Sequence, residues 1–292
     1  MTKDMKSNGL RLQVLICAYG KNGIERIADG KHPSVEGVEY LVSWQIDEEY
    51  DAPEALKRCD FRIFTSNTKG LSVNRNIALS KATAPLLLIS DDDVDYTEDG
   101  LISIINAFDN NKSQDIITFR YDSTSDKKQY PSRQCDLANP TKGYFISSIE
   151  IAFRRDAVKD KIWFNENFGV GAPFPSGEED IFLQDCLDKG LKGIFLPITI
   201  ASHKGETTSE RNLMLPSRPQ TKGAVFLRLH PRQWPLRMIA HILREIPMWK
   251  AGIVPSPIAY ALNWIKGAYK AKKYKVFPTP DYSQKYLHND RS

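Results

Sequence analysis

The sequence predicts an α/β fold in which helices cover both faces of a largely parallel sheet. Short apolar runs typical of buried strands alternate with stretches typical of helices through most of the chain. Such alternation favours strand–helix–strand units with parallel strands. With 292 residues and 41% hydrophobic residues, the chain is long enough for one large domain and an appendage.

Local patterns predict each element in turn. Strands are expected where short apolar runs are bounded by polar residues, at 12–17, 39–42, 61–64, 86–90, 115–119, 145–153 and 193–197. Helices are expected between them, at 23–28, 71–81, 101–108 and 181–189. The polar segment 121–142 is expected to cross the surface, and 163–175, rich in Gly, Asn, Phe and Pro, to form a loop.

Charge divides the chain into two regions. The net charge is +4, but residues 211–276 carry thirteen Lys and Arg and a single acid, Glu245. The preceding region is therefore acidic, which indicates a site for cations there and an anion-seeking surface in the C-terminal region. We expect a catalytic domain over residues 1–210 and a basic amphipathic region over 211–292.

Cysteine spacing and hydropathy exclude several classes of protein. The four cysteines are scattered, which favours reduced, mostly buried thiols over a zinc site or a disulfide framework. The N-terminus shows no signal-peptide pattern. The uncharged stretch 251–265 contains two prolines and is shorter than the ~20 apolar residues of a spanning helix. These features predict a cytosolic protein.

The sharpest motif is Asp91-Asp92-Asp93, directly after the apolar run 86–90. Adjacent carboxylates repel one another unless a cation or solvent relieves them. Mg²⁺ and Mn²⁺ take oxygen ligands and often keep few carboxylates beside phosphate oxygens. On an extended backbone Asp91 and Asp93 point to the same side, so one can hold ribose or a bridging water and the other a metal. The alternative is a solvated acidic turn.

A second acidic motif, S-G-E-E-D at 176–180, precedes a predicted helix. Ser176 and Glu179 fit a capping box, and acids in a first helical turn suit the helix dipole. Capping does not account for every acid, so Glu179 or Asp180 can also serve as a general base towards an acceptor hydroxyl.

Two weaker signals complete the set. The segment 69–79 brings Arg75 and Asn76 into the first turns of a helix, where guanidinium groups and helix N-termini suit phosphate or a planar base. The alternative is an ordinary helix with a solvated Arg75. His203 follows the last predicted strand and is either a ligand or a structural residue.

In their order and spacing these motifs resemble the inverting family 2 glycosyltransferases with the GT-A fold, over about residues 10–205. The resemblance implies a single GT-A-like sheet followed by a C-terminal helical basic tail. It implies metal-dependent transfer of a sugar from a nucleotide-sugar donor, a UDP-sugar by expectation, to a hydroxyl acceptor with inversion. The implied setting is the biosynthesis of cell-surface polysaccharide or glycolipid.

The resemblance also implies a role for each motif residue. It places six residues around the donor nucleotide: Ala18, Tyr19, Arg75, Asn76, Asp91 and Asp92. Asp93 and His203 would hold Mn²⁺ or Mg²⁺. Asp180 would be the catalytic base, and Glu179 would support the acceptor.

One departure from the family concerns recognition of the nucleobase. Where relatives carry an acidic D-D-G-S-like stretch after the second strand, this sequence has V-S-W-Q at 42–45. Base recognition is therefore expected to differ, through stacking on Trp44 and hydrogen bonds from Gln45.

The C-terminal region has the pattern of a membrane-surface helix. Ile258, Leu262, Ile265 and Tyr269 fall at helical spacing, and three lysines line another face. Such helices, with tryptophans nearby, suit the headgroup layer of an anionic membrane. This predicts a peripheral protein on the inner face of the cytoplasmic membrane, beside a glycan or lipid-linked acceptor. The alternative is that the apolar residues pack on the catalytic domain.

Three further expectations concern neighbouring segments and other functions. The polar segment 205–212 is a candidate lid over the donor. A metal-dependent nucleotidyltransferase would need a basic, Gly-rich phosphate loop, for which K-N-G at 21–23 is a poor candidate. A non-catalytic nucleic-acid or lipid-binding module would leave the three aspartates unexplained, and no nucleic-acid motif is present, so no nucleic-acid partner is expected.

Overall fold

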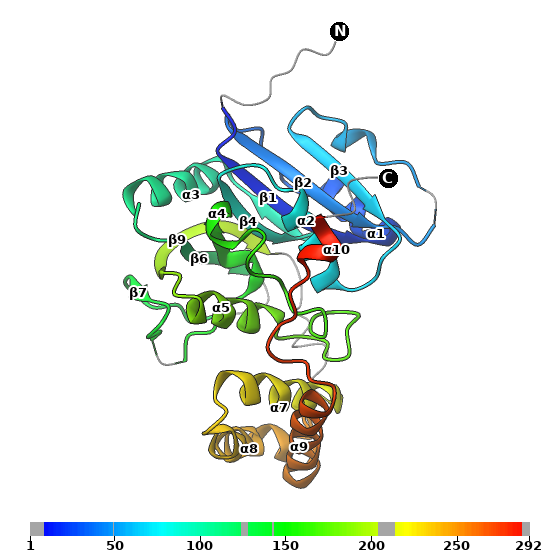
Figure 1. The fold of residues 1–292 in the computed structure, drawn as a ribbon, viewed down its shortest axis with the longest axis vertical. Helices are drawn as coiled ribbons and strands as arrows, with labels where there is room; N and C mark the ends of the chain where they lie inside the picture. Colours follow the sequence, from blue (N-terminus) through cyan, green and yellow to red (C-terminus); the bar gives the residue numbers. More distant parts are fainter. Residues whose placement is uncertain (1–8, 49, 124–127, 142, 204–213, 288–292) are drawn as a thin grey trace.

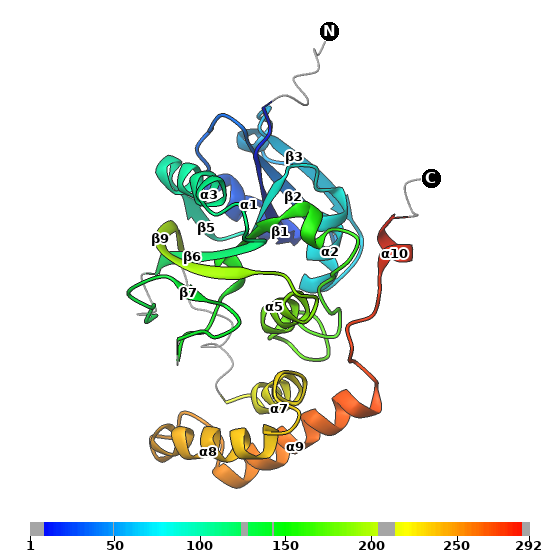
Figure 2. The same cartoon turned by 60° about the vertical axis from the view of Figure 1, so that its left-hand side comes forward.

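The structure, a computed structural model, describes residues 9–48, 50–123, 128–141, 143–203 and 214–287. Its body is a twisted sheet with helices on both sides, and the C-terminal helices lie together at one end of the molecule (Figures 1 and 2). The predicted α/β fold, with a mainly parallel sheet and C-terminal helices, is confirmed.

The sheet has the strand order β3-β2-β1-β4-β8-β6-β9-β5, with β7 paired to β9. The strands are β1 (Leu12–Tyr19), β2 (Val38–Gln45), β3 (Phe61–Ser66), β4 (Leu86–Asp91), β5 (Val94–Tyr96), β6 (Ile116–Ser123), β7 (Cys135–Asp136), β8 (Ile151–Arg154) and β9 (Gly193–His203). Strands β3, β2, β1 and β4 are parallel to one another, and β6 is parallel to β9. Strands β8, β5 and β7 run antiparallel to their neighbours.

The helices follow the strands in the predicted alternation. They are α1 (Gly20–Asp29), α2 (Leu71–Lys81), α3 (Glu98–Asn110), α4 (Arg155–Val158), α5 (Glu178–Asp188), α7 (Ser217–Leu229), α8 (Trp234–Lys250), α9 (Pro257–Lys273) and α10 (Ser283–Leu287). Short 3₁₀ turns occupy Glu54–Leu56 and Ser148–Glu150. Among the described residues, the structure contains no helix long and apolar enough to span a bilayer.

Two apolar cores lie on opposite faces of the sheet because side chains alternate along a strand. On β1, Val14 and Ile16 pack into the core that includes residues of α1 and α3. Leu15, between them, packs into the core that includes residues of α2, α4 and α5. Strands buried on both faces explain why the sequence shows unbroken apolar runs rather than strict alternation.

The predicted elements are mostly recovered, with three corrections. The helix at 71–81 has the predicted ends, but the strand predicted at 145–153 is regular only over Ile151–Arg154. The cause is a capping box between Ser147 and Glu150 that starts a 3₁₀ turn. The last strand runs on to His203. Ser176 does not cap α5, since Gly177, with φ of 88°, occupies that position.

The C-terminal region packs on the catalytic body and then returns to it. A third apolar cluster joins Phe168, Ile181 of α5, Val225 of α7 and Ala271 of α9. Beyond α9 the chain runs back along the body to α10, beside α2 (Figure 1). The expected boundary at residue 210 is therefore crossed by many contacts.

Two smaller expectations can be placed as well. All four cysteines are free, but only Cys17 and Cys186 are buried, whereas Cys59 is exposed, so the expectation of mostly buried thiols holds for half of them. The lid expected at 205–212 lies outside the described residues.

Candidate active site

A cavity of about 870 Å³ opens at the carboxyl ends of the parallel strands. Strand β1 contributes Ala18 and Tyr19, β2 contributes Gln45, and β4 contributes Asp91. The strand register pairs Tyr19 with Gln45 and Cys17 with Asp91, so these residues reach one edge together. Ligands in open α/β sheets gather at this edge.

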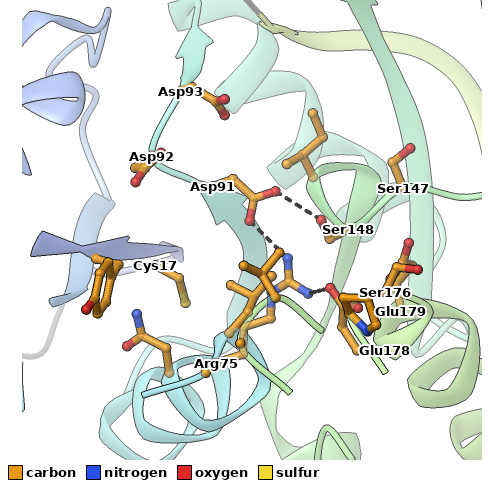
Figure 3. A pocket seen from close by; sticks show the side chains of 18 of the residues that line it. Cys17, Arg75, Asp91, Asp92, Asp93, Ser147, Ser148, Ser176, Glu178 and Glu179 are labelled. Carbon is orange, nitrogen blue, oxygen red and sulfur yellow. Dashed lines mark hydrogen bonds and ion pairs between the residues drawn. The ribbon is translucent and has the colours of Figure 1, made fainter. Parts of the chain in front are cut away.

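Arg75 of α2 lines the cavity and connects the two acidic motifs (Figure 3). Its side chain is buried, with Nη2 donating to Asp91 Oδ1 at 2.9 Å and Nη1 donating to Glu178 Oε1 at 2.8 Å. Burial alone would lower the pKa of Arg75, but the charges of Asp91 and Glu178 raise it above its usual value. The guanidinium therefore stays charged and fixes the start of α5 to the end of β4.

Asp92 is paired rather than solvated. Arg26 of α1 binds it with both ends of its guanidinium group, Nε to Oδ1 at 2.9 Å and Nη2 to Oδ2 at 2.7 Å. Burial raises the pKa of Asp92 to about 6, and the contact with Arg26 opposes that shift. The solvated-turn interpretation of the three aspartates is thus wrong for Asp92.

Asp93 and His203 meet at the cavity wall. The antiparallel pairing of Val94 with His203 brings His203 Nε2 within 3.2 Å of Asp93 Oδ1. Burial would raise the pKa of Asp93, but the hydrogen bond and charge of His203 outweigh it and lower the pKa.

Asp93 and His203 supply only two ligands to a divalent cation, so phosphate oxygens of the donor and water would have to complete its coordination. The described residues contain no cluster of three or more His, Cys, Asp or Glu side chains that could hold a metal by itself. Mg²⁺ is commonly bound by one or two protein groups together with substrate phosphates and water. Asp93 and His203 match that pattern, since both line the cavity.

The acidic start of α5 presents its three carboxylates differently. Glu178 is buried against Arg75, whereas the Glu179 carboxylate is turned away from Arg75 and lines the cavity (Figure 3). Burial and the charges of Glu178 and Asp180 raise the pKa of Glu179 well above its ordinary value. The charge of the neighbouring Glu178 raises the pKa of Asp180, whose side chain is exposed.

Most of the predicted site residues converge. Nine of them line the one cavity: Ala18, Tyr19, Gln45, Arg75, Asp91, Asp92, Asp93, Glu179 and His203.

Three predicted site residues lie outside the cavity lining, and burial excludes the expected nucleotide contacts of two of them, Trp44 and Asn76. Trp44 is buried in the core, where Nε1 donates to Gly20 O at 2.9 Å, so it cannot stack on a nucleobase. Asn76 is buried and exchanges two hydrogen bonds with the backbone of Phe164, so it does not touch a nucleotide. Asp180 is exposed at the surface beside the cavity rather than within its wall.

Several lining residues were not predicted from the sequence. Arg26, Ser148 and Arg218 belong to elements without a recognisable motif. Ser148 Oγ donates to Asp91 Oδ2 at 3.3 Å, and Arg218 comes from α7, in the region assigned to the tail. A basic residue in the helix that follows the first strand is the only local signal that would have indicated Arg26.

Comparison with known proteins gives a family match and a similar fold. Residues 43–170 match the family described as Glycosyl transferase family 2. Crystal structures of S. aureus TarS have a similar fold. One TarS structure matches with a TM-score of 0.53 and 16% identity, over 75% of this chain and 40% of that chain.

Two structures of TarS 1–349 extend the comparison. One matches with a TM-score of 0.56 and 14% identity, over 91% of this chain and 92% of that one. The same fragment in complex with UDP-GlcNAc matches with a TM-score of 0.56 and 17% identity, over 75% of this chain and 66% of that one. At these identities the likeness establishes the fold. No curated protein matches the sequence significantly.

Proposed function

The chain carries a glycosyl transferase family 2 domain, and from that premise we propose that it transfers a sugar from a nucleotide-sugar donor to a hydroxyl acceptor with inversion. The observation that carries the proposal is the convergence of both acidic motifs on one cavity, with Arg75 bound to each. The family-matched segment itself supplies Gln45, Arg75 and the three aspartates to that cavity.

We place the donor nucleotide against the ends of β1 and β2. Ala18 and Tyr19 offer a flat wall, and Gln45 offers an amide for the base in place of the expected acid. The Gln45 amide is oriented by Nε2 hydrogen bonds to Thr68 Oγ1 and Gly70 O. A UDP-sugar is the proposed donor, supported by the similar fold of TarS, which was crystallised with UDP-GlcNAc.

The proposed metal site consists of Asp93 and His203. A bound Mn²⁺ or Mg²⁺ would neutralise the departing diphosphate. The chain itself holds Asp93 through its contact with His203 and Asp92 through Arg26, so the carboxylates are fixed before donor arrives.

We propose Glu179 as the catalytic base. Of the two candidates at the start of α5, it is the one that lines the cavity. An acceptor hydroxyl needs a carboxylate within hydrogen-bond reach to take its proton as the new glycosidic bond forms. The raised pKa of Glu179 makes it a stronger base than an ordinary glutamate once it is ionised.

The acceptor is proposed to be a hydroxyl of a glycan or of a lipid-linked sugar. Phe145 and Ile146 line the cavity and offer apolar surface to a sugar ring. A setting in cell-surface polysaccharide or glycolipid synthesis, at the inner face of the cytoplasmic membrane, follows as part of the same proposal.

Donor binding tests this function directly. The purified protein is titrated with a panel of nucleotide sugars, with and without Mn²⁺, and thermal shift and released nucleoside diphosphate are recorded. We expect one donor to raise the melting temperature in a metal-dependent way, and Asp93→Ala to abolish that shift. Asp109→Ala, at an exposed ion pair with Arg11, is the matched control. Release of pyrophosphate instead of a nucleoside diphosphate would contradict the proposal.

A further inference from the structure

The C-terminal helices expose an unusual number of apolar side chains. On α8, Leu236, Ile239 and Leu243 are between 51% and 69% exposed and lie on one face at helical spacing. The opposite face of α8 carries Glu245, which is buried and bound to Arg218 of α7. The apolar side chains of α8 therefore point away from the protein.

Helix α9 has the same arrangement. Its four outward residues, Ile258, Leu262, Ile265 and Tyr269, are between 45% and 75% exposed. Its other face, with Tyr260 and Trp264, is buried. We call these seven residues, three on α8 and four on α9, the apolar face. The alternative that α9 buries these residues against the catalytic domain is wrong.

The two helices lie at the end of the molecule farthest from the sheet (Figures 1 and 2). Helix α7 lies between them and α5, and α8 and α9 lie side by side below it in both views (Figures 1 and 2). Soluble monomers seldom expose contiguous apolar surface of this kind without a partner.

The charges around the apolar face are all of one sign. Arg237, Arg244 and Lys250 of α8 are exposed, as are Lys266, Lys272 and Lys273 of α9. The only acid between residues 231 and 276 is the buried Glu245. An apolar strip flanked by exposed cations complements a surface that is apolar inside and anionic outside.

We propose that the apolar face docks the enzyme on an anionic lipid bilayer, with the aliphatic side chains in the acyl boundary and the flanking lysines and arginines among the phosphates. The phosphates of a nucleic acid would pair with the exposed cations, but a nucleic acid offers no apolar surface to the leucine and isoleucine side chains. A second copy of this face would bring cations against cations. This inference goes beyond the proposed function. Membrane docking can be measured without donor and without catalysis.

Docking also orients the active site. Arg218, which lines the cavity, is held by Glu245 of α8 through two contacts of 3.0 and 3.2 Å. The bilayer-facing helix and the cavity wall are thus joined by one buried ion pair. A lipid-linked acceptor at the bilayer surface would reach the cavity from the α7 side.

Vesicle flotation of the full chain tests the docking surface. Vesicles of phosphatidylcholine alone are compared with vesicles in which phosphatidylglycerol replaces part of that lipid. We expect the protein to float with the anionic vesicles, and Leu243→Glu with Leu262→Glu to reduce the bound fraction at least ~10-fold, because charges replace two aliphatic side chains that docking would bury in the bilayer. Ile102→Glu, an exposed isoleucine on α3, is the matched control and should float like the unchanged protein.

Two parallel measurements complete the test. The donor-induced thermal shift should be unchanged in the double variant, which separates failure of docking from failure of the fold or of the donor site. Light scattering should show that the double variant and the unchanged protein have the same mass in solution. The proposal is overturned if the protein ignores both vesicle types, if it binds them equally well after the double substitution, or if the apolar face instead forms a dimer.

Discussion

Arg75 shows how one buried cation fixes the geometry of this site. A buried charge is costly unless it is paired and hydrogen-bonded, and Arg75 meets that need with two carboxylates from separate motifs. Its guanidinium also lies 5.5 Å from the ring of Phe164. Arg75 therefore positions both acidic motifs, and its contact with the nucleotide stays a prediction.

Arg75→Met is expected to destabilise the fold by about 3–5 kcal/mol, because Asp91 and Glu178 lose their shared partner inside the protein. Urea denaturation measures this change. Arg11→Met removes an exposed ion pair with Asp109 and should cost no more than about 1 kcal/mol. Equal effects from the two substitutions would show that the Arg75 pairs do not hold the site together.

Glu179→Gln is expected to reduce kcat by about two to four orders of magnitude, as loss of a general base does. Donor affinity should change little, since Glu179 belongs to α5 and not to the strand ends that form the proposed nucleotide wall. Asp180→Asn is the matched control. Single-turnover assays with saturating donor measure both, and a larger loss in Asp180→Asn would return the base assignment to Asp180.

The pH dependence of kcat should reflect the raised pKa of Glu179. Only the ionised carboxylate accepts a proton, so activity is present above its pKa and is lost as pH falls through it. The acid limb should therefore lie above ~4.3, the ordinary value for glutamate. Asp180→Asn removes a repelling charge and should move that limb to lower pH. If the acid limb does not move in Asp180→Asn, the charge of Asp180 does not raise the pKa of Glu179.

At the scale of elements, α7 and α9 approach closely at two glycines. A Cβ on Gly223 would lie 2.0 Å from Trp264 O, and a Cβ on Gly267 would lie 1.9 Å from Gln220 O. Neither backbone oxygen can move without shifting its helix. The crossing of α7 and α9 therefore depends on the absence of these two side chains.

Gly223→Ala or Gly267→Ala is expected to destabilise the helical group by about 1–3 kcal/mol, since overpacking outweighs the better helix propensity of Ala. Hydrogen exchange should show the loss in α7 and α9 more than in β1. Gly9→Ala adds the same methyl group where no atom lies within 4 Å and serves as control. Unchanged protection in α7 and α9 would show that the helices adjust without cost.

At the scale of the whole molecule, the chain closes on itself. Tyr286 of α10 stacks on Trp163 with ring centroids 5.4 Å apart, and its hydroxyl donates to Glu166 Oε1 at 2.5 Å. The segment after α9 thus fastens the C-terminal region to the loop that precedes the acidic start of α5. The helical group and the catalytic body are connected at both ends of that group.

Tyr286→Ala is expected to lower the free energy of unfolding by about 1–2 kcal/mol, for a half-buried aromatic side chain and its hydrogen bond. Tyr269→Ala, on the apolar face, is the matched control and should be nearly neutral without membranes. Thermal denaturation measures both. Comparable losses in the two variants would mean that the return of the chain does not stabilise the body.

Local sequence patterns specify which residues end the parallel strands. Apolar runs mark buried strands, and the carboxyl ends of parallel strands meet at one edge of a sheet whatever the loops do. The convergence of Tyr19, Gln45 and Asp91–Asp93 therefore follows from the amino-acid sequence alone. The helix at 71–81 follows in the same way, since its pattern and its ends are local.

Which of two neighbouring residues faces the cavity depends on the packing of the folded chain. Trp44 and Gln45 are adjacent, yet alternation along β2 sends Trp44 into the core and Gln45 into the site. Glu179 and Asp180 are also adjacent, yet at the start of α5 only Glu179 lines the cavity, whereas Asp180 is exposed beside it. Arg218 reaches the cavity, and the apolar face stays uncovered, because of how α7, α8 and α9 pack on distant residues. Such contacts join segments far apart in the chain, so local sequence patterns do not encode them.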